Sequence, residues 1–149
     1  MPTTTATAQE LFAVVTGLRR VVRRRLRDRV PGPRLRGAQL ELLQAVEAEP
    51  GIGVAAAADA LHLAQNSVST LVNQLVAEDL LERGRDPSDR RAVRLRLTEA
   101  AEQRLRDWRE ARGRLVDDAL AGLPAAEAAA ITAALPALAH LLERIEEGT

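Results

Sequence analysis

The sequence contains no cysteine and no lysine, and it has only one phenylalanine and one tryptophan among 149 residues. The absence of cysteine excludes disulfide bonds, thiolate metal ligands and thiol-based redox sensing. The scarcity of aromatic residues, together with an apolar content rich in alanine, favours closely packed helices in a single folding unit. No apolar run approaches the roughly 18 residues that a membrane span requires, and the opening MPTTTATAQE is polar. We therefore expect a cytoplasmic protein without a membrane partner.

Net charge is also absent, since the formal charge at pH 7 is zero, but the charges are unevenly distributed. Residues 19–36 hold nine arginines and one acid, and residues 83–96 hold six arginines and two aspartates. Residues 98–149 hold six arginines and ten acids. One part of the chain is therefore suited to face an anion and another part is not.

The spacing of apolar residues predicts a mainly helical chain with one pair of short strands. The gap between the third and fourth helices is about three residues, which is typical of a helix-turn-helix. Two alternating segments joined by DPSDRR follow and predict a hairpin, so the fold class is a winged helix-turn-helix with a small two-stranded β wing. The expected helices span residues 9–29, 35–49, 54–61, 65–78, 99–121 and 125–146, and the expected strands span residues 80–85 and 92–97.

The first helix and the last two helices carry more apolar surface than one small winged helix can cover. We expect these ends, residues 8–29 and 99–147, to form a homodimer around a DNA-binding region at residues 30–98, within a single unit of residues 1–149. An intramolecular bundle that caps the winged helix is the alternative. Pro136 falls inside the last helix, where we expect a kink or a break.

The stretch GVAAAADALHLAQNSVSTLVNQLVAEDLLERGRDPSDRRAVRLRLTEAA, residues 53–101, resembles the core of MarR-family transcriptional regulators. The most specific part is DPSDRRAVRLRLTEA, which contains Asp89-x-Arg91-x-x-Arg94. The resemblance extends over essentially the whole chain. It implies a dimeric winged-helix regulator, and specifically a repressor, that binds double-stranded DNA at a pseudo-palindromic operator.

The resemblance assigns roles to the charged residues of the wing. It implies that Arg91 enters the minor groove and that Asp89 pairs with its guanidinium and orients it, which lowers the entropy lost on binding. Arg90 and Arg94 are expected to contact phosphate or to stabilise the wing. Asp86, before Pro87, is interpreted as a plain turn residue.

The fourth expected helix should enter the major groove, although it carries no positive charge. Its amides and hydroxyls can read base edges, and Asn or Gln suits adenine. Phosphate contacts must then come from the wing and from arginines at the start of the second helix. The DNA-binding candidates are Arg34, Arg36, Gln65, Asn66, Ser67, Ser69, Thr70, Asn73, Gln74, Asp89, Arg90, Arg91 and Arg94.

Three positions depart from the usual MarR pattern. Ala64 stands where a capping serine is common, so the helix start loses about 1 kcal/mol unless Asn66 or a phosphate substitutes. His62 and Asp79 stand where glycine is common, and both can adopt left-handed backbone geometry.

Two features of the helices have alternative interpretations. The run RRVVRRRLRDRV, residues 19–30, is either a DNA-facing patch or a solvated face, and we favour the second. In that interpretation it pairs with acids of the long helix, namely Glu102, Asp107 and Glu110. Phe12, Leu43 and Trp108, with a nearby arginine, are candidates for a small anionic or aromatic effector, but we slightly favour ordinary core or dimer packing for these three residues.

The sequence offers little for catalysis or metal binding. Asp59, His62 and Ser67 or Ser69 are the residue types of a hydrolase triad, but no pocket or oxyanion hole is implied around them. His62 and His140 are the only imidazoles. We expect no enzyme activity, no metal and no cofactor. The alternative to a regulator is a helical protein-interaction module that has lost operator binding.

Overall fold

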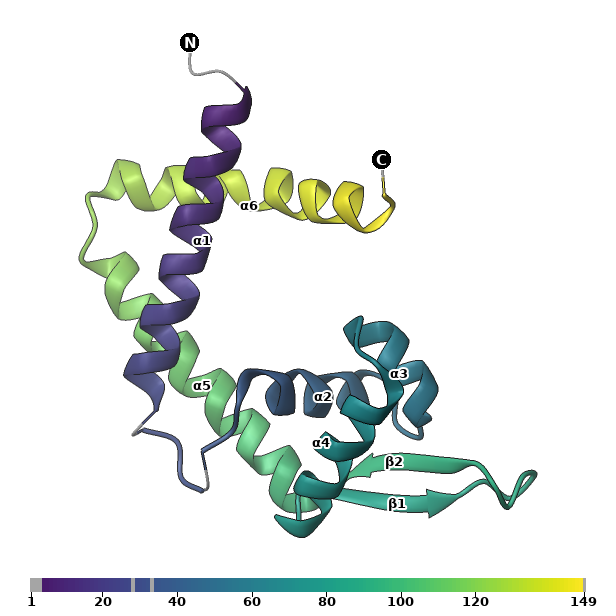
Figure 1. Ribbon diagram of the computed structural model, residues 1–149. Helices are drawn as coiled ribbons and strands as arrows, with labels where there is room; N and C mark the ends of the chain where they lie inside the picture. Colours follow the sequence, from purple (N-terminus) through teal and green to yellow (C-terminus); the bar gives the residue numbers. More distant parts are fainter. Residues whose placement is uncertain (1–3, 28, 33, 149) are drawn as a thin grey trace. The chain divides into compact units, whose positions relative to one another are not determined.

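The computed structural model describes residues 4–27, 29–32 and 34–148, and this part of the chain forms six helices and one two-stranded antiparallel sheet (Figure 1). The elements are α1 (Thr4–Leu26), α2 (Gly37–Ala48), α3 (Val54–Leu61), α4 (Gln65–Ala77), β1 (Leu81–Arg85), β2 (Val93–Leu97), α5 (Glu99–Ala121) and α6 (Ala125–Glu146). The chain divides into two compact units, Met1–Ala111 and Arg112–Thr149, and α5 runs from the first into the second.

This architecture confirms the predicted fold class, mainly α-helical with a small β wing. The bounds of α3, α5 and α6 agree with the sequence prediction, whereas α1 begins five residues earlier than expected and ends before residue 29. Alanine and threonine at the start of α1 include no helix breaker, so the helix extends past the region where its apolar stripe is visible.

The core of the first unit is the winged helix. Helix α2 contributes Leu42, Leu43 and Val46, and the inward faces of α3 and α4 pack against them. The other buried apolar residues of this cluster are Ile52, Ala57, Ala58, Val68, Val72, Leu75, Leu80, Leu81, Leu95, Ala101 and Leu105. Each large side chain in such a core contributes about 2–5 kcal/mol, so one compact cluster holds the helix-turn-helix in place.

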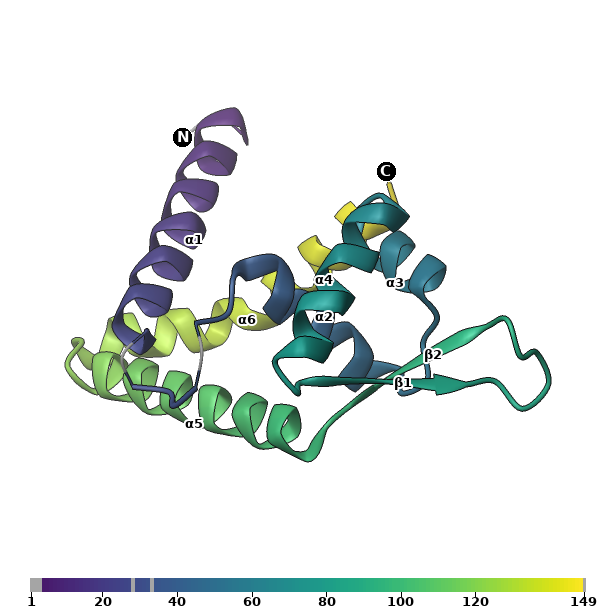
Figure 2. The same ribbon diagram turned by 60° about the horizontal axis from the view of Figure 1, so that its bottom comes forward.

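The wing is an antiparallel hairpin in which Leu81 pairs with Leu97 and Arg85 pairs with Val93. Figures 1 and 2 both show it extending beyond α3 and α4. At its base the hairpin is joined to the segment before α3, because Gly51 donates to the Leu95 carbonyl at 2.8 Å and Leu95 donates to the Ile52 carbonyl at 3.0 Å. The strands are therefore fixed at the core while the turn extends into solvent.

Thr98, directly after β2, joins the base of the wing to the start of α5 and to the turn that follows α4. Its hydroxyl accepts the Ala101 N–H at 3.1 Å, which caps α5, and donates to the Asp79 carbonyl at 2.7 Å. Asp79 and His62 both have positive φ, 58° and 53°, which confirms the left-handed turns expected at these positions.

Helix α6 corrects two sequence expectations. It continues through Pro136 as one α-helix, so the predicted break is absent. The proline removes one backbone donor, but the surrounding side chains are exposed, and water can satisfy the carbonyl that loses its partner. Over Ala125–Glu146 the helix is also long and apolar enough to cross a membrane by length and composition, with a mean hydropathy of 1.5, contrary to the expectation that no segment approaches this requirement.

Candidate nucleic-acid interface

Helix α4 separates a buried face from an exposed polar face. Val68, Val72 and Leu75 are buried in the core, while the amide and hydroxyl side chains lie on the surface. Six of the seven predicted recognition residues are exposed, namely Gln65, Asn66, Ser67, Ser69, Thr70 and Asn73, and Gln74 is half-buried. The helix therefore presents uncharged donors and acceptors to a ligand.

The start of α4 is capped from within the helix. Ala64 makes no side-chain capping bond, but Asn66 Oδ1 accepts the Ser67 N–H at 2.9 Å. The Thr70 hydroxyl in turn donates to the Asn66 carbonyl at 3.0 Å. Asn66 therefore takes over the capping role of the serine that Ala64 replaces, which is one of the two substitutes that we expected from the sequence.

The turn of the wing is shaped by backbone contacts of its two aspartates. Asp89 Oδ1 accepts the backbone N–H of Arg91 at 2.9 Å, and the Ala92 N–H bonds to the Asp89 carbonyl at 3.1 Å. Arg90 and Arg91 are exposed. Asp89 therefore fixes the backbone from which the Arg91 side chain extends, whereas we expected it to hold the guanidinium.

Asp86, interpreted from the sequence as a plain turn residue, instead forms the ion pair of the wing. It receives hydrogen bonds from Arg94 Nε at 3.0 Å and from Arg94 Nη2 at 2.6 Å. It also accepts the Ser88 N–H and hydroxyl at 2.9 and 2.7 Å. These bonds from Ser88, and then the Arg94 guanidinium, hold the pKa of Asp86 well below its usual range.

Arg94 extends this arrangement to the body of the winged helix. Its Nη1 donates to the Gly51 carbonyl at 3.1 Å, in the segment that also pairs with Leu95. Arg94 therefore joins the wing turn to the residues before α3 while remaining about half exposed. A half-exposed guanidinium in this position suits the wing-stabilising role that the sequence allowed.

The arginine run of residues 19–29 shows a different pairing from the one expected. Arg19 pairs with Glu41 of α2 at 3.6 Å, whereas Glu102 pairs with Arg106 and Asp107 accepts a bond from Gln103 of its own helix. Glu102 and Asp107 therefore bond along α5, whereas we expected from the sequence that they would pair with the arginines of α1. The bond between α5 and α2 is made by Arg109 with Glu47, at 2.7 and 2.8 Å, and it lowers the pKa of Glu47.

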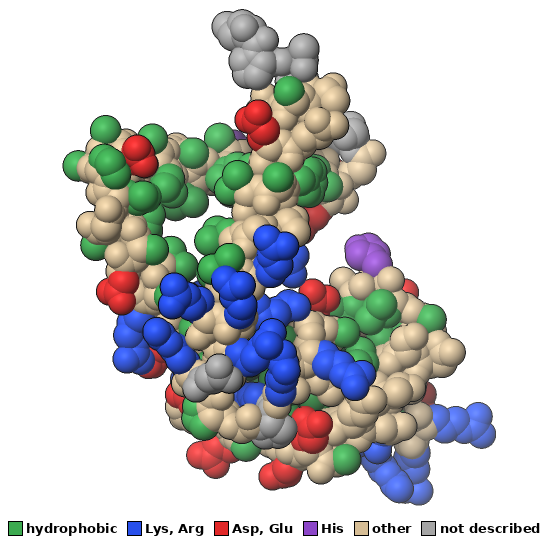
Figure 3. Space-filling view, turned by 60° about the vertical axis from the view of Figure 1, so that its left-hand side comes forward, with side chains coloured by type: hydrophobic (Ala, Val, Ile, Leu, Met, Phe, Trp, Pro, Cys, Tyr) green, Lys and Arg blue, Asp and Glu red, His purple; other side chains and the backbone are tan. Residues whose placement is uncertain are grey.

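Arg34 and Arg36 lie exposed just before α2 and line a cavity of about 270 Å³ in the first unit. Arg23, Arg27 and Arg104 also line this cavity, which Figure 3 shows as a gathering of basic side chains at the end of α1. Its apolar wall is formed by Leu26, Leu40, Leu105 and Trp108. Burial lowers the pKa of Arg104, although the nearby charge of Glu78 opposes that effect.

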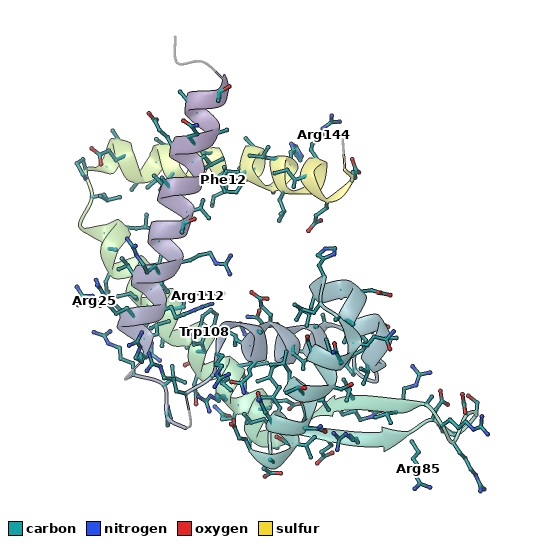
Figure 4. All side chains as sticks on the ribbon, viewed as in Figure 1. Phe12, Arg25, Arg85, Trp108, Arg112 and Arg144 are labelled. Atoms are coloured by element: carbon teal, nitrogen blue, oxygen red, sulfur yellow. The ribbon has the colours of Figure 1, made fainter. Side chains whose placement is uncertain are left out.

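The structure does not bring the three predicted effector residues together. Trp108 lines the cavity, whereas Leu43 is fully buried in the core and Phe12 is 63% exposed farther along α1 (Figure 4). The chemistry at Trp108 is nevertheless that expected for an anion, because arginines surround an apolar wall.

Within the described ranges, no three histidine, cysteine, aspartate or glutamate side chains gather into a group able to hold a metal ion. His62 is exposed at the end of α3, and Asp59, Ser67 and Ser69 are likewise on the surface. The residues of the imagined triad therefore have no buried pocket in which to act.

Sequence reasoning missed Asp86 and also Arg83, which donates to Asn73 Oδ1 from β1. The pairing register of the hairpin could have predicted the ion pair between Asp86 and Arg94. Since Gly84 pairs with Arg94, Asp86 lies diagonally across the hairpin from that arginine, within reach of a long side chain.

Comparison with known proteins gives one family and one fold. Residues 35–92 match the family model described as MarR family. A transcriptional regulator from Thermotoga maritima is 25% identical, with a TM-score of 0.72 over 96% of this chain and 98% of its own. A MarR family protein from Bacillus stearothermophilus is 23% identical, with a TM-score of 0.77 over 94% and 96% of the two chains. FabT from Streptococcus pneumoniae, solved in complex with DNA, is 21% identical, with a TM-score of 0.72 over 93% and 99%.

Proposed function

From the premise that this winged helix belongs to the MarR family of transcriptional regulators, we propose that the protein is a homodimeric repressor of a pseudo-palindromic operator. One observation carries this proposal: the same small domain exposes a polar recognition helix and an arginine-bearing wing. The domain organisation that we propose is a DNA-binding region at residues 30–98 with dimerisation helices at residues 8–29 and 99–147.

The DNA contacts follow from this arrangement. Helix α4 reads the major groove, and Arg91 at the exposed turn enters the minor groove, where a narrow groove has a more negative potential. Asp89 positions Arg91 through its backbone N–H, which supports a preformed turn. Arg90, Arg34 and Arg36 contact phosphates, and Arg94 stabilises the wing.

Dimerisation is supported by apolar side chains that the single chain leaves exposed. Helix α6 contains no buried residue, and Phe12, Val14 and Leu18 of α1 are more than half exposed. On α6 the exposed apolar residues recur at three- to four-residue spacing, at Ile131, Leu135, Leu138, Leu142 and Ile145. A second copy covers such a stripe with the same stripe, which a two-fold dimer requires.

The arginine-lined cavity is the proposed effector site. Its volume of about 270 Å³ is at the low end for ligand pockets and suits a single-ring carboxylic acid or another small anion. Such an effector regulates DNA binding only if it prefers one spacing of the two recognition helices. We place this regulator in the cytoplasm, where its operator is accessible.

Fluorescence anisotropy tests the proposal, with purified protein on the intergenic DNA upstream of its own gene and on a scrambled duplex. Binding should be tighter to the first duplex and should weaken steeply as salt rises, because arginine–phosphate contacts release counterions. Equal and weak binding to both duplexes would favour the protein-interaction module instead.

A further inference from the structure

Helix α4 carries amides whose oxygen atoms are already bonded within the protein. Resting on the proposed binding of α4 to DNA, we propose that these contacts orient the amides as hydrogen-bond donors and that Arg83 is a specificity-determining residue. The base facing Asn73 is then guanine or thymine, whose polar groups in the major groove are all acceptors, and adenine, which also presents the N6 donor, is disfavoured.

The contact between Arg83 of β1 and Asn73 of α4 is the main observation behind this proposal. Arg83 Nη2 donates to Asn73 Oδ1, and both side chains are exposed. Since a guanidinium has no acceptor, only the carboxamide oxygen of Asn73 can face Arg83. The two N–H groups of Nδ2 are therefore the part of the carboxamide that Asn73 offers to DNA.

The amide of Gln74 is oriented in the same way through a relay from the start of α2. The backbone N–H of Arg36 donates to Gln39 Oε1 at 2.8 Å, which leaves Nε2 as the other end of the Gln39 amide. Gln39 Nε2 then donates to Gln74 Oε1 at 3.3 Å. Gln39 is buried, so the protein core holds this orientation.

Asn66 completes the pattern at the N-terminal end of α4. Its Oδ1 accepts the Ser67 N–H at 2.9 Å, so its Nδ2 also remains the donor end. Three amides on one helix thus have their oxygen atoms engaged by N–H groups of the protein.

This orientation changes which bases the helix can read. A paired contact with adenine needs an amide N–H for N7 and an amide oxygen for the N6 amino group. At Asn73 the oxygen already accepts a charge-assisted bond from Arg83, so adenine N6 would have to share this oxygen with the guanidinium. Guanine O6 and N7 or thymine O4 need only donors. The general preference of Asn and Gln for adenine therefore does not extend to Asn73.

Arg85 provides a matched control for Arg83. The two arginines lie two residues apart on β1, so they share one face of the strand, and Figure 4 shows Arg85 pointing outward from the hairpin. Removing either one deletes the same charge from the wing. Only Arg83 has its guanidinium on Asn73.

The experiment selects bound sequences from a pool of random DNA duplexes with the full-length protein and four variants. Asn73→Ala identifies the base position that Asn73 reads, by an approximately fivefold or larger loss of preference there. At that position the wild type should enrich guanine or thymine, and Arg83→Ala should shift enrichment toward adenine. Asn73→Asp, which keeps the acceptor for Arg83 but lacks the donors, should abolish the guanine or thymine preference. Arg85→Ala should lower affinity for all sequences without changing the preferred base.

The outcomes separate this inference from the function on which it rests. If the wild type enriches no sequence, operator binding fails and the inference fails with it. If the wild type enriches a palindrome but prefers adenine at the Asn73 position, the function stands and the inference is overturned. The same holds if Arg83→Ala and Arg85→Ala leave identical base preferences, or if Asn73→Ala changes no position.

Discussion

At the scale of single residues, the two aspartates of the wing have different structural roles. Asp89 holds the backbone of Arg91, and Asp86 holds the guanidinium of Arg94. Arg91 is thus left with an exposed side chain on a fixed turn, whereas Arg94 is already engaged by the protein. Arg91 therefore combines an exposed guanidinium with a fixed backbone, which suits the proposed entry into the minor groove.

Arg91→Ala should weaken operator binding by about 1–3 kcal/mol, because it removes a minor-groove guanidinium without touching the core. Anisotropy on the operator measures this loss. Thermal unfolding followed by circular dichroism should give an unchanged Tm. Arg91→Lys should bind with intermediate affinity, since it keeps the charge but loses the planar donor group. An unchanged affinity for Arg91→Ala would assign minor-groove binding to another wing residue.

Asp86 makes the wing sensitive to acid. Its pKa in the folded protein lies below the ordinary value of about 3.9, so the folded state binds fewer protons than the unfolded state in this range. The stabilisation is therefore complete at neutral pH and is lost as the pH falls below about 4 toward the folded pKa. Hydrogen exchange of the wing amides should show protection decreasing over this range in the wild type.

Asp86→Asn is the matched variant, since it keeps an oxygen for Ser88 but loses the charge that pairs with Arg94. Its wing amides should be less protected at neutral pH, and their protection should not fall further with acid. The same acid dependence in the wild type and the variant would show that another group controls the wing.

At the scale of elements, the sequence predicted every helix and strand but could not assign all the contacts between them. Apolar spacing is a local signal, and it gave the bounds of α3, α5 and α6. Pro136 does not break α6, because its alanine and leucine neighbours are strong helix formers. The partners of Asp86, Arg83 and Arg19 depend on hairpin register and on the packing between helices, which a single sequence does not specify.

Thr98 shows how one side chain joins elements, and its removal can be tested. Thr98→Val keeps the shape but loses the α5 cap and the bond to the Asp79 carbonyl, so the free energy of unfolding should fall by about 1–3 kcal/mol. Urea denaturation measures the change. Thr98→Ser keeps the hydroxyl and should lose about 1 kcal/mol or less. If both variants are equally destabilised, the methyl group is responsible instead of the hydrogen bonds.

At the scale of the whole molecule, the distribution of exposed apolar and charged residues separates two surfaces. Arginines gather at the wing and at the end of α1, and exposed leucine and isoleucine side chains follow one stripe of α6. A repressor of a palindrome needs both, because two linked winged helices bind two half-sites far more tightly than one. By length and composition, α6 could cross a membrane. The same length and composition also suit a helix whose apolar stripe is covered by a second copy.

The double variant Leu135→Glu/Leu142→Glu tests this role of α6. Two carboxylates placed within the exposed apolar stripe should make the protein monomeric in sedimentation velocity, because a two-fold interface would bring each substituted stripe against its copy. Operator affinity should then fall by about 100-fold or more, since the two half-sites are no longer bound by linked domains. Ala133→Glu is the matched control, because Ala133 lies on the opposite face of the same exposed helix. A double variant that remains dimeric would mean that α6 is not the interface, and a monomer with undiminished operator affinity would mean that each winged helix binds DNA independently.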